Sequence, residues 1–268
     1  DNEVLITAFL ANADANEWIS YLSLFDATGP IEERSFDTVL NLNLDLFRVS
    51  GLSLKNLKSE ARIHNKGISI NFESELLDGN LFLPKATDKF LKLNLTRLDI
   101  SSSFLVSQID NQTLDPRKFI NADIDIKNIT VDKKHWGDIG FELRSNSKGA
   151  LFKNITGEIF GLKPGSDIEE LTNFRWEFDG QSHISRLNGP VGIDNMSDFF
   201  RRLELDPPID SKSGAINFDL DWQDQPWAFS KENLGGDFKI ELNEGNFYTS
   251  PGGGSAALKL VSLFDVFL

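Results

Sequence analysis

Residues 213–255 read SGAINFDLDWQDQPWAFSKENLGGDFKIELNEGNFYTSPGGGS, with apolar and polar residues alternating on both sides of an aromatic corner. In the first half, Ile216, Phe218, Leu220 and Trp222 share one parity, and polar residues occupy most of the positions between them. Because successive side chains of a β-strand point to opposite faces, this stretch predicts two strands, each with one apolar and one polar face.

The same alternation recurs through most of the chain. Glycine-bearing turns such as HNKGI, LDGNL, NSKGA and NEGNF lie between the alternating segments, as is typical of antiparallel hairpins. The pattern therefore predicts a mainly β protein, with a long antiparallel sheet rich in meanders.

Three segments break the alternation and predict two or three short helices. In residues 12–25, Asp14 can cap a helix near 15–25, and Asp194 can cap a second helix within 193–208. Residues 254–268 predict a terminal helix less clearly, since their apolar residues share no clean face. The polar stretch 101–117 predicts a long loop with one helical turn.

Composition excludes several classes of protein. The 268 residues carry a formal charge of −14 with an isoelectric point near 4.7, which argues against a nucleic-acid-binding surface. Cysteine is absent, so disulfides and thiol chemistry are excluded. No run of 18 apolar residues occurs, so the sequence predicts no membrane-spanning helix in this segment. The abrupt start at DNEVLITAFL and end at VSLFDVFL lead us to expect a segment of a longer protein.

An internal repeat relates two parts of the chain. Residues 54–67 align with residues 136–149, which pairs Glu60 with Glu142, Arg62 with Arg144, Lys66 with Lys148 and Gly67 with Gly149. Strand, turn and strand agree across the alignment, so we expect a structural unit that is used at least twice.

Few residues suggest chemistry. The three histidines, His64, His135 and His183, lie far apart in the sequence and predict surface or structural roles. The common hydrolase and thiol motifs are missing, and the sequence predicts no metal site and no cofactor. The Asn-x-Thr triplets at Asn94, Asn128 and Asn154 are interpreted as coincidence.

Paired acidic residues offer one route to catalysis. Asp219 and Asp221, like Asp123 and Asp125, lie two residues apart on a predicted strand and so share a face, as glycosidase or metal chemistry would need. That face is opposite the apolar one, so a solvated surface explains them more simply.

The C-terminal third resembles a known family. Its pattern is an alternating strand ending at Trp222, then Pro226-Trp227-x-Phe229, Leu234-x-Gly236, a second alternating strand, Gly245-x-Phe247 and Pro251-Gly252-x-Gly254. This resembles the C-terminal region of the YhdP branch of the AsmA-like proteins. LNGPVGIDNMSDFFRRLELDPP upstream, and the rhythm of residues 44–84, are similar to that branch too.

The resemblance implies a long twisted β-sheet curled lengthwise into an apolar groove, the repeating β-groove architecture. It implies an inner-membrane-anchored protein of the Gram-negative periplasm that conducts phospholipid toward the outer membrane without catalysis. Repeated groove units are expected over residues 1–186, and an AsmA-like C-terminal region over residues 187–268. The expected partners are phospholipid acyl chains and the two membranes, the membranes contacted through parts outside this segment; envelope protein partners stay open.

The candidate lining residues are those on the apolar faces of the predicted strands. They are Leu40, Leu42, Leu44, Leu46, Ile68, Ile70, Phe72, Leu93, Leu95, Ile124, Ile126, Phe174, Trp176, Phe178, Ile216, Phe218, Leu220, Trp222, Phe238, Ile240 and Leu242. Two alternatives stay open: a β-sandwich or solenoid scaffold of the envelope with a closed dry core, and a glycan-processing enzyme using Asp219 and Asp221.

Overall fold

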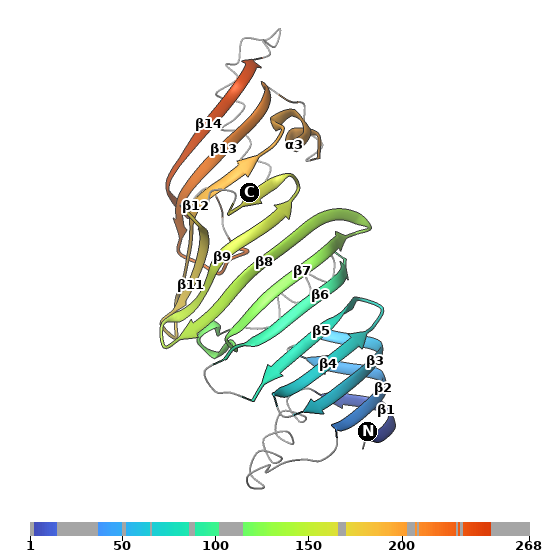
Figure 1. Cartoon of the computed structure of the whole chain (residues 1–268). Helices are drawn as coiled ribbons and strands as arrows, with labels where there is room; N and C mark the ends of the chain where they lie inside the picture. The colour runs from blue at the N-terminus through green and yellow to red at the C-terminus, as the bar shows by residue number, and fades with distance from the viewer. Residues whose placement is uncertain are drawn as a thin grey trace. The chain divides into compact units, whose positions relative to one another are not determined.

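The computed structural model describes a mainly β protein whose strands belong to a mixed sheet of fourteen strands (Figure 1). Described are residues 3–14, 37–49, 52–64, 66–85, 89–101, 115–165, 170–202, 207, 209–228, 230 and 233–247. The chain divides into two compact units, unit 1 with residues 1–113 and 122–136 and unit 2 with residues 114–121 and 137–268. The predicted boundary between residues 186 and 187 separates repeated groove units from a C-terminal region, and it stays a prediction.

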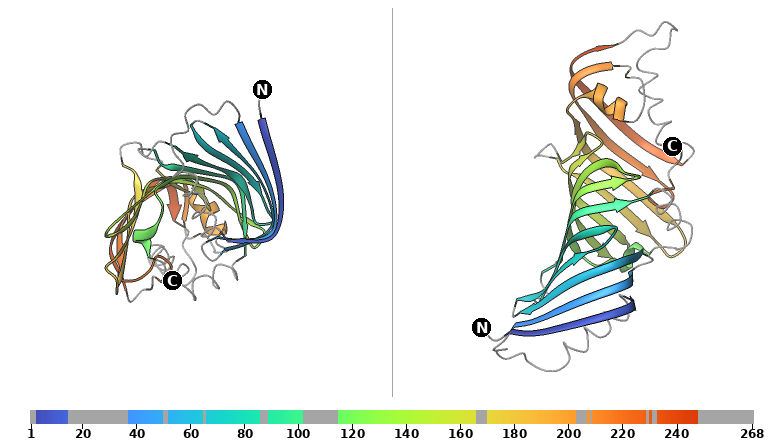
Figure 2. Two further views of the ribbon diagram at one scale, coloured as in Figure 1. Left: turned by 90° about the horizontal axis from the view of Figure 1, so that it is seen from below. Right: turned by 90° about the vertical axis from the view of Figure 1, so that its right-hand side faces the viewer.

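Unit 1 contains seven strands that are hydrogen-bonded in chain order. They are β1 (Glu3–Asp14), β2 (Asp37–Val49), β3 (Leu52–His64), β4 (Gly67–Glu73), β5 (Leu77–Pro84), β6 (Leu91–Ile100) and β7 (Ala122–Val131). Figure 2 shows β1 and β2 bending along their length. This part of the chain thus has the predicted meander of strands.

Two pairings in unit 1 are parallel, where the sequence predicted antiparallel ones. β1 pairs with β2 in parallel, and so does β6 with β7. A two-residue turn can only reverse the chain, whereas a connection of a dozen or more residues can carry it back to the starting end of the sheet. Residues 15–36 and 101–121 are the two connections of that length in unit 1, so each long non-alternating segment marks a parallel pair.

Among its described residues, unit 2 contains the remaining strands and two short helices. They are β8 (Lys134–Asn146, from Gly137 onward), β9 (Gly149–Ile159), β10 (Leu162–Pro164), β11 (Thr172–Phe178), β12 (His183–Ile193), β13 (Ile209–Trp222) and β14 (Leu234–Phe247), with a 3-10 helix η1 (Pro116–Lys118) and α3 (Met196–Arg202). The strands pair in the order β8-β9-β10-β12-β13-β14, and β11 pairs with both β9 and β12. The strand pairs described above for this unit are all antiparallel.

One predicted helix is confirmed, with a different cap. In α3, the Asp198 backbone N–H donates to the Asn195 side-chain oxygen at 3.0 Å, so Asn195 and not Asp194 is the cap. Asp194 instead binds the Lys163 ammonium. The helices predicted near 15–25 and over 254–268 lie outside the described residues, although Asp14, the expected cap of the first, ends β1. Among the described residues no helix is long and apolar enough to cross a membrane.

A four-residue motif recurs at three irregular positions in the strands. Leu54-Lys55-Asn56-Leu57, Ile126-Lys127-Asn128-Ile129 and Phe152-Lys153-Asn154-Ile155 each carry an asparagine with a left-handed backbone, at φ values of 52°, 49° and 54°. Asparagine tolerates this conformation better than other residues with a side chain, and one such residue shifts the alternation by one position. The apolar residues on both sides can therefore point to the same face. Two of the three Asn-x-Thr triplets are thus explained by backbone geometry.

The internal repeat is visible in three dimensions. Arg62 pairs with Glu60 at 2.9 Å in β3, and Arg144 pairs with Glu142 at 3.0 Å in β8, so the same Glu-x-Arg ion pair occurs in both copies. Gly67 and Gly149 each open the next strand with a positive φ, where a Cβ atom would meet a backbone carbonyl oxygen at about 2.2 and 2.1 Å. Both hairpins therefore need glycine at this position for one steric reason.

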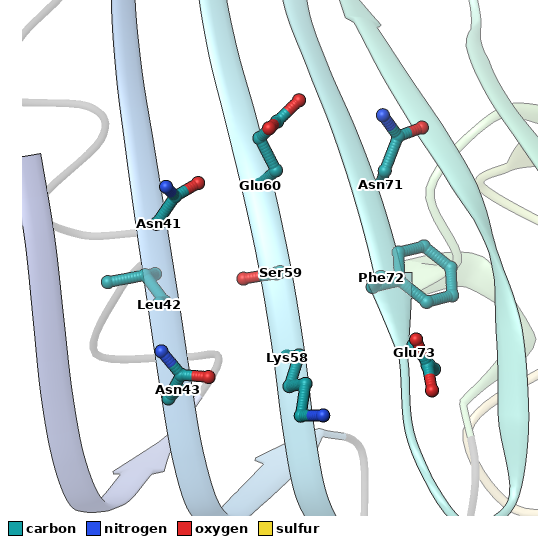
Figure 3. Close-up of a pocket in the computed structure, with 9 residues that line it drawn as sticks. All are labelled: Asn41, Leu42, Asn43, Lys58, Ser59, Glu60, Asn71, Phe72 and Glu73. Atoms are coloured by element: carbon teal, nitrogen blue, oxygen red, sulfur yellow. The ribbon is translucent and has the colours of Figure 1, made fainter. Parts of the chain in front are cut away.

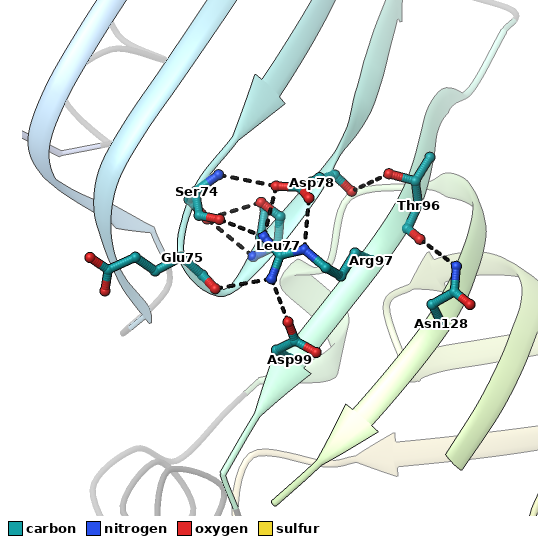
Figure 4. Close-up of polar contacts among 8 residues, drawn as sticks. All are labelled: Ser74, Glu75, Leu77, Asp78, Thr96, Arg97, Asp99 and Asn128. Carbon is teal, nitrogen blue, oxygen red and sulfur yellow. Dashed lines mark hydrogen bonds and ion pairs between the residues drawn. The ribbon is translucent and has the colours of Figure 1, made fainter. Parts of the chain in front are cut away.

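A polar network closes the β4–β5 turn of unit 1 (Figure 4). Arg97 on β6 donates to both carboxylate oxygens of Asp78 at 2.7 and 2.9 Å, and to the backbone oxygens of Ser74 and Glu75 at 2.7 and 3.1 Å. It also binds Asp99. The hydrogen bonds from Arg97 hold the pKa of Asp78 below its usual value. The Arg97 guanidinium is thus occupied within the protein.

Candidate functional site

The register of unit 1 builds two neighbouring apolar rows across all seven strands. The first contains Ile6, Leu40, Ala61, Ile70, Leu81, Leu93 and Ile124, in strand order. The second contains Ala8, Leu42, Ser59, Phe72, Gly79, Leu95 and Ile126. Only one side chain in the two rows, the Ser59 hydroxyl, is polar, so the apolar face continues from strand to strand.

The opposite face of unit 1 is polar. Its corresponding row contains Thr7, Asn41, Glu60, Asn71, Asn80, Asn94 and Asp125. Neighbouring amides hydrogen-bond across strands, as from Asn94 Nδ2 to Asn80 Oδ1 at 3.0 Å. The sheet thus presents one face suited to hydrocarbon and one suited to water.

Most side chains of the two apolar rows are only half-buried. Leu40, Ile70, Leu81, Leu93 and Ile124 all keep part of their surface accessible, and Ile6 is 48% exposed. A shallow hollow of about 350 Å³ at β2, β3 and β4 is lined by residues of both parities, so it is not assigned to one face (Figure 3); they are Leu42, Ser59 and Phe72 with Asn41, Asn43, Lys58, Glu60, Asn71 and Glu73. The apolar face of unit 1 is therefore open to a further apolar group along much of its width.

Where the left-handed asparagines shift the alternation, a denser cluster forms. Ala13, Leu44, Leu54 and Leu57 are buried together, with Phe47 packed against them. Leu46, which we predicted to share the face of Leu44, instead lies opposite Lys55 in the register and outside this cluster. Simple alternation assigned Leu46 to the wrong position, and Phe47 takes its place.

Unit 2 has an apolar row of its own, which is rich in aromatic rings. It contains Leu143, Phe152, Phe174, Leu187, Leu220 and Gly236, in strand order. Ring centroids lie 5.4 Å apart for Phe141 and Phe152, 5.6 Å for Phe152 and Phe174, and 5.9 Å for Phe174 and Trp222. These rings form a continuous aromatic band across β8, β9, β11 and β13.

The helix α3 covers one end of this face. Met196 and Phe199 of α3 are buried against Ile193 and Ile216, and four further side chains pack around them: Leu162, Phe218, Ile240 and Leu242. Of the predicted lining residues, Ile216 therefore belongs to a cluster that includes two residues of α3, and Phe218, Ile240 and Leu242 pack against that cluster. Phe238, on β14, is 37% exposed.

A second cover lies over the other end of unit 2. Trp176 is buried, with the ring of Trp227 at 5.4 Å and that of Phe119 at 5.6 Å, both edge-on. The Ser185 hydroxyl donates to the Asp224 carbonyl at 2.8 Å and Trp222 Nε1 donates to the Gln225 carbonyl at 2.9 Å, which ties the β13–β14 connection to the sheet. The half-buried residues of the face thus lie between two covered ends.

His183 belongs to this second cover. Trp176 Nε1 donates to His183 Nδ1 at 3.0 Å, so the neutral ring carries its proton on Nε2, and the ring stacks on Phe178 at 4.2 Å. Burial lowers the pKa of His183 below 6.5, although Asp224, Asp115 and Asp179 act in the opposite direction. The Arg117 guanidinium lies over the ring of Phe178, 4.8 Å from its centroid.

We therefore expect acid to weaken this cover. Because the folded-state pKa of His183 is depressed, the unfolded chain takes up the proton first, and the stabilisation present above pH 6.5 is lost as the pH falls below it. The unfolding midpoint in urea should fall between pH 7.5 and 5, and it should fall less in His183→Gln, whose amide oxygen can still accept from Trp176. Superimposable pH profiles of the two proteins would contradict this role.

The predicted acidic pairs lie on the polar faces. Asp219 and Asp221 are exposed, opposite Asn188 and Arg186 in the register, and Asp125 pairs with Lys127 at 3.1 Å. Within the described ranges, no group of three histidine or acidic side chains is placed to hold a metal ion. The predicted lining residues belong to the two apolar faces, on the other side of the sheet from these acids.

One comparison with known proteins identifies a family for this chain. A family model described as YhdP protein matches residues 1–266, nearly the whole chain. No curated protein and no solved structure matches the chain. Since the match covers both units and all fourteen strands, the chain belongs to the YhdP family.

Proposed function

We propose that this chain binds phospholipid acyl chains on its apolar faces and conducts them between the inner and outer membranes of a Gram-negative envelope, without catalysis. The observation that supports this most directly is the pair of apolar rows across β1–β7, whose side chains are mostly half-buried. A face intended only for a core would be buried by a second layer of protein.

The energetics favour such a face. A phospholipid carries on the order of 30 methylenes, and each one costs about 0.8 kcal/mol in water, so crossing bare solvent costs roughly 25 kcal/mol. A face that covers the hydrocarbon on one side removes much of that cost, while the polar headgroup remains in water. Passing along a row of similar apolar side chains then requires no single large step.

Placement in the periplasm, as part of an inner-membrane-anchored protein, follows as part of the same proposal. The net charge of −14 and the polar outer rows keep a protein with such apolar faces soluble in an aqueous compartment. The membrane-contacting parts are assigned to regions outside this segment.

An envelope scaffold with a closed dry core is the rival that one observation favours. The burial of Ile216 under Met196 and Phe199 of α3 is ordinary core packing. If unit 1 were covered in the same way by protein, its apolar rows would need no lipid. The two functions therefore differ in what lies against β1–β7.

The test is the lipid content of the purified chain. Native mass spectrometry after expression in a Gram-negative host, with organic extraction of the same sample, should find at least one phospholipid per chain. Delipidated protein incubated with nitrobenzoxadiazole-labelled phospholipid should take the label up again. A folded chain that carries no lipid and takes up none would favour the scaffold.

A further inference from the structure

One end of unit 1 carries a group of exposed lysines. Lys66 lies in the turn between β3 and β4, Lys85 follows β5, and Lys89 precedes β6. The Lys85 backbone N–H donates to the Lys66 carbonyl at 3.0 Å, so the two turns lie side by side. We name Lys66, Lys85 and Lys89 the lysine rim; it lies where β3 and β5 end and β4 and β6 begin (Figure 1).

These three charges have no carboxylate partner among the described residues. No ion pair is formed by Lys66, Lys85 or Lys89 with any carboxylate in the part of the chain that the structure describes. The chain as a whole is strongly acidic, with 41 acidic and 27 basic residues. The three lysines therefore form a group of cations without an ion-pair partner among the described residues; Asp88, between Lys85 and Lys89 in the sequence, lies outside those residues.

The opposite ends of the same strands differ in charge. Glu75, Asp78 and Asp99 lie around the β4–β5 turn, and Arg97 there is held by Asp78 and Asp99 (Figure 4). An anion at that turn would meet carboxylates and an occupied guanidinium; the exposed cations of the same end, Arg48 and Lys133, lie on β2 and after β7. At the lysine rim it would meet ammonium groups that can turn toward it.

The lysine rim is in phase with the apolar face. Ile68, Leu83 and Leu91 are each two residues from Lys66, Lys85 and Lys89, respectively, and Ile68 pairs directly with Leu83. Two residues of strand span about 7 Å. Hydrocarbon resting on Ile68 and Leu83 would thus place a polar group attached to it within reach of the lysines.

The internal repeat keeps one of the three lysines; at the same offset, Lys85 and Lys89 align with Asp167 and Leu171. Lys148 aligns with Lys66, is exposed, and directly precedes Gly149 as Lys66 precedes Gly67. The steric need in each turn is met by the glycine alone. The lysine is therefore retained in both copies at a position where the fold does not require a cation.

We propose that the lysine rim binds the phosphate of anionic phospholipid headgroups while their acyl chains lie on Ile68, Leu83 and the rows beyond. This rests on the proposed function and deepens it, because it assigns the headgroup side of unit 1 and a preference for lipids with net negative charge. Phosphatidylglycerol should then bind better than phosphatidylethanolamine, whose ammonium offsets its phosphate.

The experiment compares two charge-reversal variants of the full 268-residue chain. Lys66→Glu/Lys85→Glu alters the rim, and Arg48→Glu/Lys133→Glu makes the same change in net charge at the opposite strand ends of unit 1. Each delipidated protein is offered labelled phosphatidylglycerol and labelled phosphatidylethanolamine, and the ratio of the two bound is measured. We expect the rim variant to lower that ratio roughly fivefold, from two lost surface ion pairs, and the control to leave it unchanged.

The outcomes separate this inference from the proposed function. If the wild-type chain binds neither lipid, the proposed function fails; if it binds both and the rim variant keeps the wild-type ratio, only the lysine rim is refuted. Salt at 0.5 M should weaken the preference in the wild type and in the control, and should change the ratio little in the rim variant. Competition by glycerol 3-phosphate that displaces phosphatidylglycerol at equal concentration would show a site for free phosphate, and it would also overturn the assignment to a lipid headgroup.

Discussion

Leu93→Asp is expected to abolish lipid loading of this segment while the protein still folds. Leu93 lies near the β7 end of the first apolar row of unit 1, directly between Leu81 and Ile124. A carboxylate there must either be covered by the passing acyl chains without a partner, which costs several kcal/mol, or hold water in their path. Since 1.4 kcal/mol corresponds to a factor of ten, bound phospholipid should fall at least roughly tenfold.

Two neighbouring changes serve as matched controls. Asn94→Asp adds the same charge one residue along β6, on the exposed polar face, and should leave the lipid content unchanged. Leu93→Ala removes packing but adds no charge, and should keep most of the lipid. Lipid per chain is measured by native mass spectrometry, and thermal unfolding reports folding. A folded Leu93→Asp protein with wild-type lipid content would refute the conducting role of this row.

Much of the apolar face could be predicted from alternation alone. Leu40, Leu42, Ile70 and Leu93 occupy the rows that period two assigns to them, because a regular strand has no other choice. The prediction went wrong at Leu46, since a single left-handed asparagine across the sheet, Asn56, moves the alternation by one position. The repeated apolar-Lys-Asn-apolar motif was visible in the sequence and would have located these shifts.

Other features of the fold could not be predicted from the local sequence pattern. Period two shows that β1 and β2 are strands, but their parallel pairing follows from a long connection whose path the alternation does not contain. Leu81 and Phe152 were missed as members of the apolar rows because a glycine two residues before Leu81 and a neighbouring bulge near Phe152 interrupt the pattern there. The covers over Ile216 and Trp176 depend on contacts far apart in the chain, which no local pattern reports.

Gly149→Ala should lower the free energy of unfolding of unit 2 by about 3 kcal/mol. This is a large effect for a substitution that only adds a methyl group. Gly149 opens β9 with φ near 159°, and a Cβ atom there would lie 2.1 Å from the Trp176 carbonyl oxygen and 2.8 Å from the Glu177 Cα. Both are backbone atoms of β11, so relief of the clash requires the two strands to separate. The β9–β11 separation would also loosen the aromatic band through Phe152 and Phe174.

Gly235→Ala is the matched control, because its Cβ would meet Asp221 Oδ1 at 3.5 Å, an ordinary contact, on an exposed part of β14. Its unfolding free energy should stay within about 0.5 kcal/mol of the wild type. The repeat predicts the same effect in unit 1. In Gly67→Ala the new Cβ atom would lie 2.2 Å from the Leu83 carbonyl oxygen, so this change should destabilise unit 1 as Gly149→Ala destabilises unit 2. Equilibrium unfolding in urea measures all three. Equal urea midpoints for Gly149→Ala and Gly235→Ala would refute the claim that close strand packing requires glycine at position 149.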